Sequence, residues 1–352
     1  MGDAMNIENM LISENITILE AMEKLDRTAK RILFVVEEKK LLAAISDGDI
    51  RRWILSSGSL DAKVREVANY KPQYLYWRER KKAKKLLKEK ALVAIPIVNE
   101  ALEVVTIVFD NDAPNFYVSD ELAGVPIVVM AGGRGTRLYP YTKILPKPLI
   151  PVNDTPIIEH VIRSFYKYGC RDFYLVVNHK KNMIKAYFAE LDMDYSVNYA
   201  DEDVPLGTGG GLYLLKGKIN STFVLTNCDI LIQDNIADIY KMHKEQGNII
   251  TMVCSVKNFV IPYGIVDIAE NGEIKGMKEK PALSFLTNTG CYIVESEVID
   301  ELKDNVAIGF PDIIEKYRKQ GKRVGVYPIS EASWLDMGQI DELRKMEQEL
   351  QR

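Results

Sequence analysis

At 352 residues, the chain is long enough for two or more domains with hydrophobic cores of their own. Its 47% hydrophobic and 27% charged residues are ordinary for a globular protein in water, and its formal net charge of -4 gives no support for a nucleic-acid partner. No apolar run approaches transmembrane length and no signal-peptide pattern opens the chain. We therefore expect a cytoplasmic protein without a membrane partner.

The four cysteines are not spaced as metal ligands. Cys170, Cys228, Cys254 and Cys291 form no C-x-x-C pair and keep no ligand-like spacing with the three histidines. We expect free thiols rather than a structural zinc site.

The first third of the chain contains the same pattern twice, after a short tail at 1–6 whose residues 1–4 look like a remnant of expression. Each copy has apolar residues at helical spacing, followed by two apolar runs that a polar turn separates. The expected elements are a helix at 16–28 with strands at 31–36 and 41–45, and then a helix at 79–90 with strands at 94–98 and 102–109. Two such units side by side resemble a pair of CBS motifs (a Bateman module) of α+β fold, which we assign to 7–56 and 57–115.

The first CBS-like unit carries the pattern of a nucleotide site. In the resemblance, the hydroxyl of Ser46 meets a phosphate and the carboxylate of Asp49 meets a ribose. The second unit departs from the pattern, because Phe109 stands where the first has Ser46, although Asp112 aligns with Asp49. One regulatory adenine or guanine nucleotide is expected. The alternative is that Asp47 and Asp49 only cap the helix that follows them.

After a linker expected at 116–124, strands alternate with helices from residue 125 to the end. This alternation predicts an α/β, Rossmann-like domain at 125–352 with a mainly parallel sheet. In such sheets, ligands bind at the carboxyl ends of the strands. The expected strands are 126–130, 172–177, 196–199 and 222–225, and the expected helices are 156–168, 180–191 and 236–246, with another that begins at 210–215.

A glycine-rich loop follows the first of these strands. Its residues are Ala131, Gly132, Gly133, Arg134, Gly135, Thr136 and Arg137. Glycines leave backbone N–H groups free for a ligand, and guanidinium groups suit phosphate oxygens. The loop lacks the Gly-Lys-Ser/Thr ending of a P-loop and the glycine spacing of a dinucleotide fold. Farther on, two prolines bracket Lys147 in a stiff turn.

The whole pattern from residue 130 to residue 149 resembles the signature of sugar-1-phosphate nucleotidyltransferases. The resemblance implies a nucleoside triphosphate on Ala131, Gly132, Gly133, Arg134, Gly135 and Thr136, with Arg137 and Lys147 as catalytic residues. A second glycine-rich loop, 205–212, would close over the nucleobase through Gly207 and Thr208. The alternative for this second loop is a flexible hairpin.

Two aspartates complete the catalytic pattern. Asp229 follows an apolar strand, and Asp336 lies in Ser333-Trp334-Leu335-Asp336 near the end of the sequence. The resemblance implies that both hold Mg²⁺, a cation that prefers oxygen ligands and keeps several waters, and that Asp229 is also catalytic. Taken alone, either aspartate could serve as a cap or turn residue.

The resemblance assigns the sugar phosphate to Gly264, Glu279, Lys280 and Asn288, which follow Asp229 in the family's order. A Glu-Lys pair is also common on solvated faces.

The expected reaction is transfer of a nucleoside monophosphate from a nucleoside triphosphate to a hexose 1-phosphate, giving a nucleoside-diphosphate sugar and pyrophosphate. The overall resemblance is to CBS-linked enzymes of surface-sugar pathways, among them glucosamine-1-phosphate guanylyltransferases of legionaminic acid synthesis. This suggests GTP and glucosamine 1-phosphate, with mannose 1-phosphate or with UTP, dTTP or CTP as alternatives. A different class, a non-catalytic nucleotide sensor, stays open. Because Bateman modules often pair, we also expect a homo-oligomer.

Overall fold

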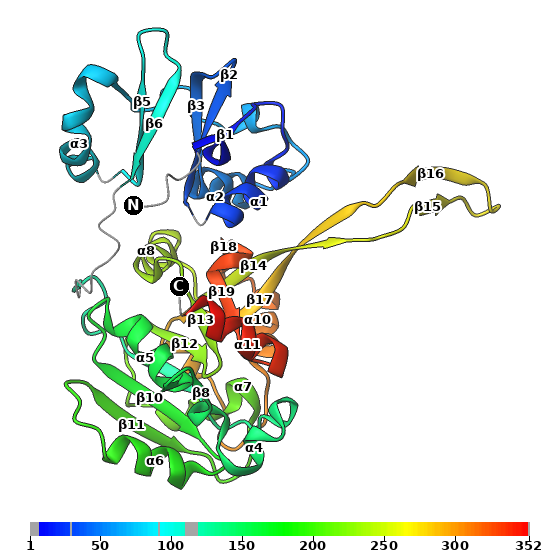
Figure 1. Ribbon diagram of the computed structural model, residues 1–352. Coiled ribbons are helices and arrows are strands. Elements are labelled where there is room, and N and C mark those ends of the chain that lie inside the picture. Colours follow the sequence, from blue (N-terminus) through cyan, green and yellow to red (C-terminus); the bar gives the residue numbers. More distant parts are fainter. Residues whose placement is uncertain (1–6, 29, 91, 110–118, 351–352) are drawn as a thin grey trace. The chain divides into compact units, whose positions relative to one another are not determined.

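The computed structural model describes residues 7–28, 30–90, 92–109 and 119–350 (Figure 1). The chain divides into two compact units. The first comprises 1–115 with 257–285 and 330–332, and the second comprises 116–256, 286–329 and 333–352. Within the range predicted for the transferase domain, two segments thus group with the N-terminal unit.

The first unit contains two three-stranded sheets with the same strand arrangement. In each sheet the first strand runs parallel to the second, and the second pairs antiparallel with the third. The internal repeat expected from the sequence is therefore present in the strand order. The strands are β1 (Leu11–Ile12), β2 (Ile32–Glu37) and β3 (Lys40–Ser46) in one sheet, and β4 (Leu75–Tyr76), β5 (Ala94–Val98) and β6 (Val104–Phe109) in the other.

The helices of the two repeats differ. In the first repeat, α1 (Ile18–Thr28) buries one apolar stripe, and α2 (Asp47–Leu55) follows β3. In the second, the helix expected at 79–90 is split into a 3-10 segment, η3 (Trp77–Lys82), and a short α3 (Ala83–Glu89). Like charges one helical turn apart, as in the Arg80/Lys84 pair, disfavour a continuous α-helix here.

A seven-stranded, mainly parallel sheet forms the centre of the second unit, as the sequence predicted. The first four strands in its order are mutually parallel, and β17 is antiparallel to β12. The order is β11 (Ser196–Asp201), β10 (Asp172–Val177), β7 (Ile127–Met130), β12 (Phe223–Asn227), β17 (Ala282–Val294), β14 (Ile250–Val260) and β18 (Val324–Ile329).

Helices cover both faces of this sheet, because its strands are apolar on both sides. In β7, for example, Ile127 and Val129 face one core and Val128 faces the other. The first core is closed by α5 (Ile157–Tyr166), α6 (Lys181–Ala189), α8 (Ile236–Gln246) and α11 (Ile340–Glu349). The second is closed by η6 (Gly211–Leu215), α9 (Glu297–Asp300) and α10 (Phe310–Lys319).

Two sequence expectations need correction in this unit. The described part of the expected linker, 119–124, packs against the rest of the second unit. Leu122 is buried, and its N–H donates to the carbonyl of Tyr168 at 2.9 Å. The helix expected to begin at 210–215 is instead a single α turn, α7 (Gly207–Gly210), followed by the 3-10 segment η6. Consecutive glycines favour such a short turn because they lower helix propensity.

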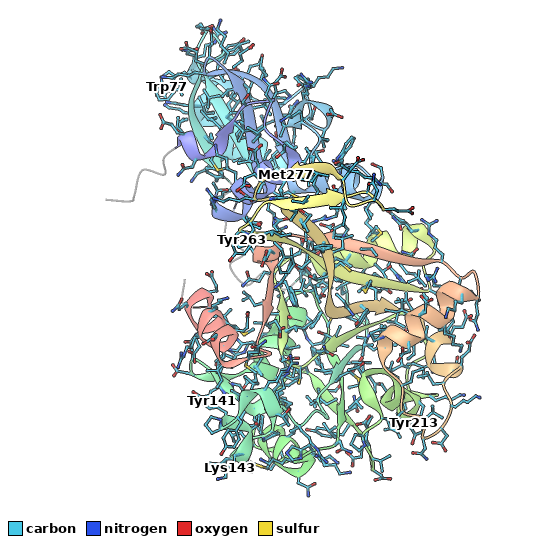
Figure 2. The ribbon with its side chains drawn as sticks, turned by 90° about the vertical axis from the view of Figure 1, so that its right-hand side faces the viewer. Trp77, Tyr141, Lys143, Tyr213, Tyr263 and Met277 are labelled. Atoms are coloured by element: carbon cyan, nitrogen blue, oxygen red, sulfur yellow. The ribbon has the colours of Figure 1, made fainter. Side chains whose placement is uncertain are left out.

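Strands β15 (Ile265–Ile268) and β16 (Ile274–Lys278) form an antiparallel ribbon within 257–285 (Figure 1). Tyr263 and Met277, labelled in Figure 2, are 74% and 66% exposed. A lone two-stranded ribbon is only marginally stable in water, so the exposed apolar side chains mark this segment as one that gains from a covering surface.

No described helix combines the length and the apolar character that crossing a membrane requires. All four cysteines are free and buried, as expected.

Candidate active site

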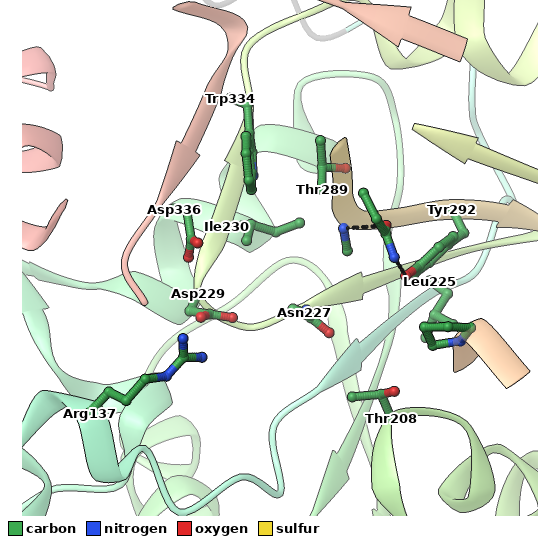
Figure 3. Close-up of a pocket in the computed structure, with 13 residues that line it drawn as sticks. Arg137, Thr208, Leu225, Asn227, Asp229, Ile230, Thr289, Tyr292, Trp334 and Asp336 are labelled. Carbon is green, nitrogen blue, oxygen red and sulfur yellow. Dashed lines mark hydrogen bonds between the residues drawn. The ribbon is translucent and has the colours of Figure 1, made fainter. Parts of the chain in front are cut away.

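The candidate site lies at the switch point of the second unit's sheet. From β7 the chain moves outward to β10 and β11, and then returns to β12 on the other side of β7. The loops after β7 and β12 therefore diverge and leave a crevice at the carboxyl ends of the two strands. Two adjoining cavities of about 300 and 320 Å³ occur here, and both are lined by Arg137, Thr208, Asn227 and Asp229 (Figure 3).

The glycine-rich loop begins directly at the end of β7. The N–H of Ala131 donates to the carbonyl of Val176 at 2.8 Å, which holds the loop against β10. Gly132 and Gly133 line the second cavity. Gly135 has φ of +61°, and a Cβ there would come within 3.0 Å of the Lys147 Cβ. This glycine thus lets the loop pack closely on the stem of Lys147.

Lys147 and Asp229 form a buried ion pair between Nζ and Oδ2. The two side chains are only 13% and 11% exposed. Burial, the largest single influence, lowers the pKa of Lys147, but the charge of Asp229, the hydrogen bond to it and the charges of Cys228 and Asp336 together outweigh burial and leave the pKa raised. The lysine therefore stays cationic at the end of β12, where a phosphate could bind.

Asp336 is held beside Asp229 by a small sheet. Strand β19 (Trp334–Asp336) pairs antiparallel with β13 (Ile230–Ile232), and the N–H of Met337 donates to the carbonyl of Asp229 at 2.8 Å. Both carboxylates line the first cavity (Figure 3). Burial first, and the charge of Asp229 second, raise the pKa of Asp336.

This pair of carboxylates fits a hard divalent cation. Two oxygen-bearing side chains suffice for Mg²⁺ when phosphates and waters supply the remaining ligands. The mutual repulsion that raises the pKa of Asp336 is what a cation would relieve. Within the described residues, no group of three or more His, Cys, Asp or Glu side chains could hold a metal ion, so a dedicated all-protein cage is not seen there.

Arg137 comes from the short segment η4 (Thr136–Leu138), and its guanidinium points toward Asp229 in Figure 3. Within the part of the chain that the structure describes, this guanidinium has no hydrogen-bond or ion-pair partner. Arg134 and Thr136 do not line either of these cavities. They line a separate hollow of about 480 Å³ together with Tyr139 and His179.

The second glycine-rich loop is packed and partly helical, unlike the flexible hairpin that was the alternative. Gly207 has φ of +79°, and a Cβ there would lie 2.7 Å from the carbonyl oxygen of Ile308. The hydroxyl of Thr208 accepts from the N–H of Phe310 at 3.0 Å. Gly207 and Thr208 thus lie in the second cavity on a loop anchored to the start of α10.

Of the four residues predicted to bind the sugar phosphate, the structure places Asn288 in the first cavity. Its Nδ2 donates to the hydroxyl of Tyr292 at 2.7 Å, and its Oδ1 accepts from the N–H of Gly290 at 3.0 Å. Gly264, Glu279 and Lys280 belong to the segment 257–285 in the other compact unit, so their role stays a prediction.

In the first unit, Ser46 and Asp49 line a cavity of about 440 Å³. They also form a capping box: Asp49 Oδ2 accepts from the Ser46 N–H at 2.8 Å, and Ser46 Oγ accepts from the Asp49 N–H at 3.2 Å. Asp49 therefore takes part in capping α2, and because it also lines the cavity, its contact with a ribose stays a prediction. Asp112, the matching residue of the second repeat, lies outside the described residues.

Glu202, Asn227 and Trp334 are among the residues that line the two cavities and were not predicted as site residues from the sequence. Glu202 had the same signal as Asp229, a carboxylate directly after a strand. We expected that strand to end at 199, but β11 continues to Asp201.

Comparison with known proteins decides the family. The nucleotidyl transferase family profile matches residues 127–352, and the CBS domain profile matches residues 1–56. The chain belongs to the nucleotidyl transferase family. The matched range contains both glycine-rich loops and both aspartates.

Curated relatives include sugar-1-phosphate enzymes with different nucleotides. They are a UTP–glucose-1-phosphate uridylyltransferase from Synechocystis (30% identity over 234 residues), a bifunctional protein GlmU from Methanococcus maripaludis (32% over 220) and a mannose-1-phosphate guanyltransferase from Saccharomyces cerevisiae (32% over 225). Each alignment covers 60% of the chain. The aligned part spans 60%, 51% and 61% of these relatives, respectively.

A crystal structure of HddC from Yersinia pseudotuberculosis superposes with a TM-score of 0.51 at 20% identity. The match covers 64% of the chain and 99% of HddC. It shows a shared fold.

Proposed function

We propose that the protein transfers a nucleoside monophosphate from a nucleoside triphosphate to a sugar 1-phosphate, releasing pyrophosphate. The observation that carries this proposal is the common crevice of Arg137, Lys147, Asp229 and Asp336 at the sheet's switch point. Cations for phosphate and carboxylates for a divalent metal occur together there. The names of the relatives support the same reaction class.

The chemistry needs little from a general base. A phosphate oxygen of the sugar 1-phosphate attacks the α-phosphorus, the bond from that phosphorus to the β-phosphate bridging oxygen breaks, and pyrophosphate leaves with the electron pair. The attacking oxygen is already anionic, so catalysis rests on positioning and charge neutralisation. Arg137 would neutralise the triphosphate, and Lys147, with Lys280, would hold the sugar phosphate close to it. Mg²⁺ held by Asp229 and Asp336 would neutralise further phosphate charge.

For the substrates, we propose GTP and glucosamine 1-phosphate, in a pathway to surface glycans such as legionaminic acid. The mannose-1-phosphate guanyltransferase among the relatives supports GTP, whereas the uridylyltransferase supports UTP with another sugar phosphate. Mannose 1-phosphate, dTTP and CTP also remain alternatives. A regulatory nucleotide at the CBS-like unit, a homo-oligomer and a cytoplasmic location belong to the same proposal.

Pyrophosphate release with a panel of nucleoside triphosphates and hexose 1-phosphates tests the reaction. We expect turnover with at least one pair. If no pair is turned over while a nucleotide still binds, the protein is a nucleotide sensor and the proposed reaction is wrong.

A further inference from the structure

Lys180 lies in the loop between β10 and α6, beside the glycine-rich loop that follows β7. The N–H of His179 donates to the carbonyl of Gly132 at 3.4 Å, so the two loops contact each other at the carboxyl ends of their strands. Lys180 has φ of +54°, a conformation that costs free energy in a residue with a Cβ. This cost indicates that other contacts of the residue hold it there.

The ammonium group of Lys180 holds the end of α4 (Tyr141–Ile144). Its Nζ donates to three successive backbone carbonyls, those of Thr142, Lys143 and Ile144, at 2.9, 2.8 and 2.9 Å. The last carbonyls of a helix have no partner within the helix and carry partial negative charge. Because a lysine has three N–H donors and a positive charge, one side chain satisfies all three carbonyls.

The packing of α4 alone gives it little support. The helix is four residues long, and a helix this short is not stable by itself in water. Tyr141, labelled in Figure 2, and Ile144 are 47% and 73% exposed. The hydrogen bonds from Lys180 therefore tie an exposed turn to the loop after β10.

The end of α4 leads directly into the turn of Lys147. Leu145 and Pro146 are the two residues between them, and the proline ring restricts the backbone of this link. The glycine-rich loop packs on the other side, where Gly135 leaves room for the stem of Lys147. A shift at the end of α4 would therefore be passed on to Lys147.

We propose that Lys180 is a positioning residue, which fixes Lys147 for the reaction by anchoring the end of α4. Lys180 is not among the residues that line the two cavities, so it acts through Lys147. A misplacement of about 1 Å in a reacting site can cost about 100-fold in rate, so the anchor has a measurable effect. The inference rests on the proposed nucleotidyltransferase function, in which Lys147 holds the sugar phosphate.

The test is Lys180→Met, which keeps an unbranched stem and removes the charge and all three donors. With the substrate pair that the wild type prefers, we expect kcat/KM for the sugar 1-phosphate to fall about 10- to 100-fold, and KM for the triphosphate to change less than about twofold. Lys180→Arg, which keeps the charge and the donors, should restore most of the loss. The matched control is Lys181→Met at the next residue, where the ammonium pairs with exposed Asp201 at 3.8 Å. This control should keep the wild-type values.

A second background separates positioning from structural support. In Lys147→Arg, the guanidinium keeps a positive charge beside Asp229 but no longer has the position that Lys180 sets. Adding Lys180→Met there should cost less than about threefold, whereas a loss of stability alone would lower activity by the same factor in both backgrounds. An equal loss in both, or full activity of Lys180→Met, overturns the inference and leaves the reaction standing.

Hydrogen exchange tests the anchor without relying on turnover. Backbone N–H groups within 141–150, among them those of Leu145 and Ile150, are hydrogen-bonded inside this segment. Lys180→Met should speed their exchange, and Lys181→Met should not. If the wild type turns over no pair of substrates, the proposed reaction is wrong, whereas faster exchange still supports the anchor and unchanged exchange overturns it. Should Lys180→Met not fold, Lys180→Gln, which removes the charge and shortens the side chain, must show the same effects.

Discussion

At the scale of single residues, the ion pair between Lys147 and Asp229 determines how the activity of a variant of either residue must be interpreted. Both side chains are buried, so removing one charge leaves the other without compensation. An inactive variant of either residue could therefore be inactive because the site has lost stability, and this must be separated from a loss of chemistry.

Asp229→Asn is expected to lower kcat by at least about 100-fold, since charge neutralisation in the transition state carries catalysis. It should also lower the free energy of unfolding by about 3 kcal/mol, because the Lys147 ammonium loses its counter-charge. Pyrophosphate release and thermal melting measure the two effects.

The double variant Lys147→Met, Asp229→Asn separates them. It should regain much of the lost stability and remain inactive. Near-normal turnover in Asp229→Asn would contradict both the catalytic and the metal assignment of Asp229.

Glu202 has the opposite stability effect. Because its carboxylate is buried and Oε1 has no hydrogen-bond partner among the described residues, Glu202→Gln should raise the free energy of unfolding by on the order of 1 kcal/mol. Denaturant unfolding of the variant and of Asp201→Asn, a control at the neighbouring residue, checks this. A clear loss of stability in Glu202→Gln would mean that the carboxylate serves the fold.

At the scale of elements, each of the two glycine-rich loops contains a glycine with positive φ, Gly135 in the first and Gly207 in the second. Residues other than glycine adopt this conformation only at a cost in free energy. Gly207 and Gly217 both have positive φ, but only Gly207 also has a close neighbour, the carbonyl of Ile308. Alanine substitutions at the two positions therefore distinguish the cost of a positive φ, which both share, from the cost of steric overlap, which arises at Gly207.

Gly217→Ala should cost about 1 kcal/mol in stability with unchanged kinetics. Gly207→Ala should cost more and raise KM for the triphosphate, because the loop must shift away from α10. Steady-state kinetics and melting of both variants measure this, and equal KM values would show that the loop does not touch the nucleotide.

The sequence predicted which helices and strands are present better than it predicted the residues at which they end. Strong apolar periodicity was enough to find β7, β10 and β12, and their order along the chain indicated a mainly parallel sheet. Glu202 was missed because β11, at the sheet edge, alternates apolar and polar residues and continues two residues past its expected end. The pairing of β13 with β19 could not be predicted, since it joins short segments about a hundred residues apart.

At the scale of the whole molecule, the chain joins a CBS-like unit to a unit of the nucleotidyl transferase family, and the described residues of each line a cavity. The first repeat was predicted to bind a nucleotide, and its Ser46–Asp49 capping box faces a cavity of suitable size.

Asp49→Asn should weaken binding of AMP or GMP at the CBS-like cavity about tenfold, since it replaces a charged acceptor for ribose hydroxyls. The matched control is Asp47→Asn in the same helix turn, where the carboxylate pairs with Arg51 at 2.5 Å and does not line the cavity. Titration calorimetry on the full chain gives both affinities. Equal weakening by the two variants would assign the effect to the helix rather than to the ligand.

The β13–β19 pairing also has a consequence for biosynthesis. Asp229 and Asp336 are held together by one backbone hydrogen bond and a three-residue ladder, although 107 positions separate them in the chain. A ribosome has therefore made the Asp229 loop long before β19 emerges to dock on it. Until then, a nascent chain can fold strands such as β7 and β12 but cannot bring the two carboxylates together, so this pair of carboxylates forms only after β19 has been made.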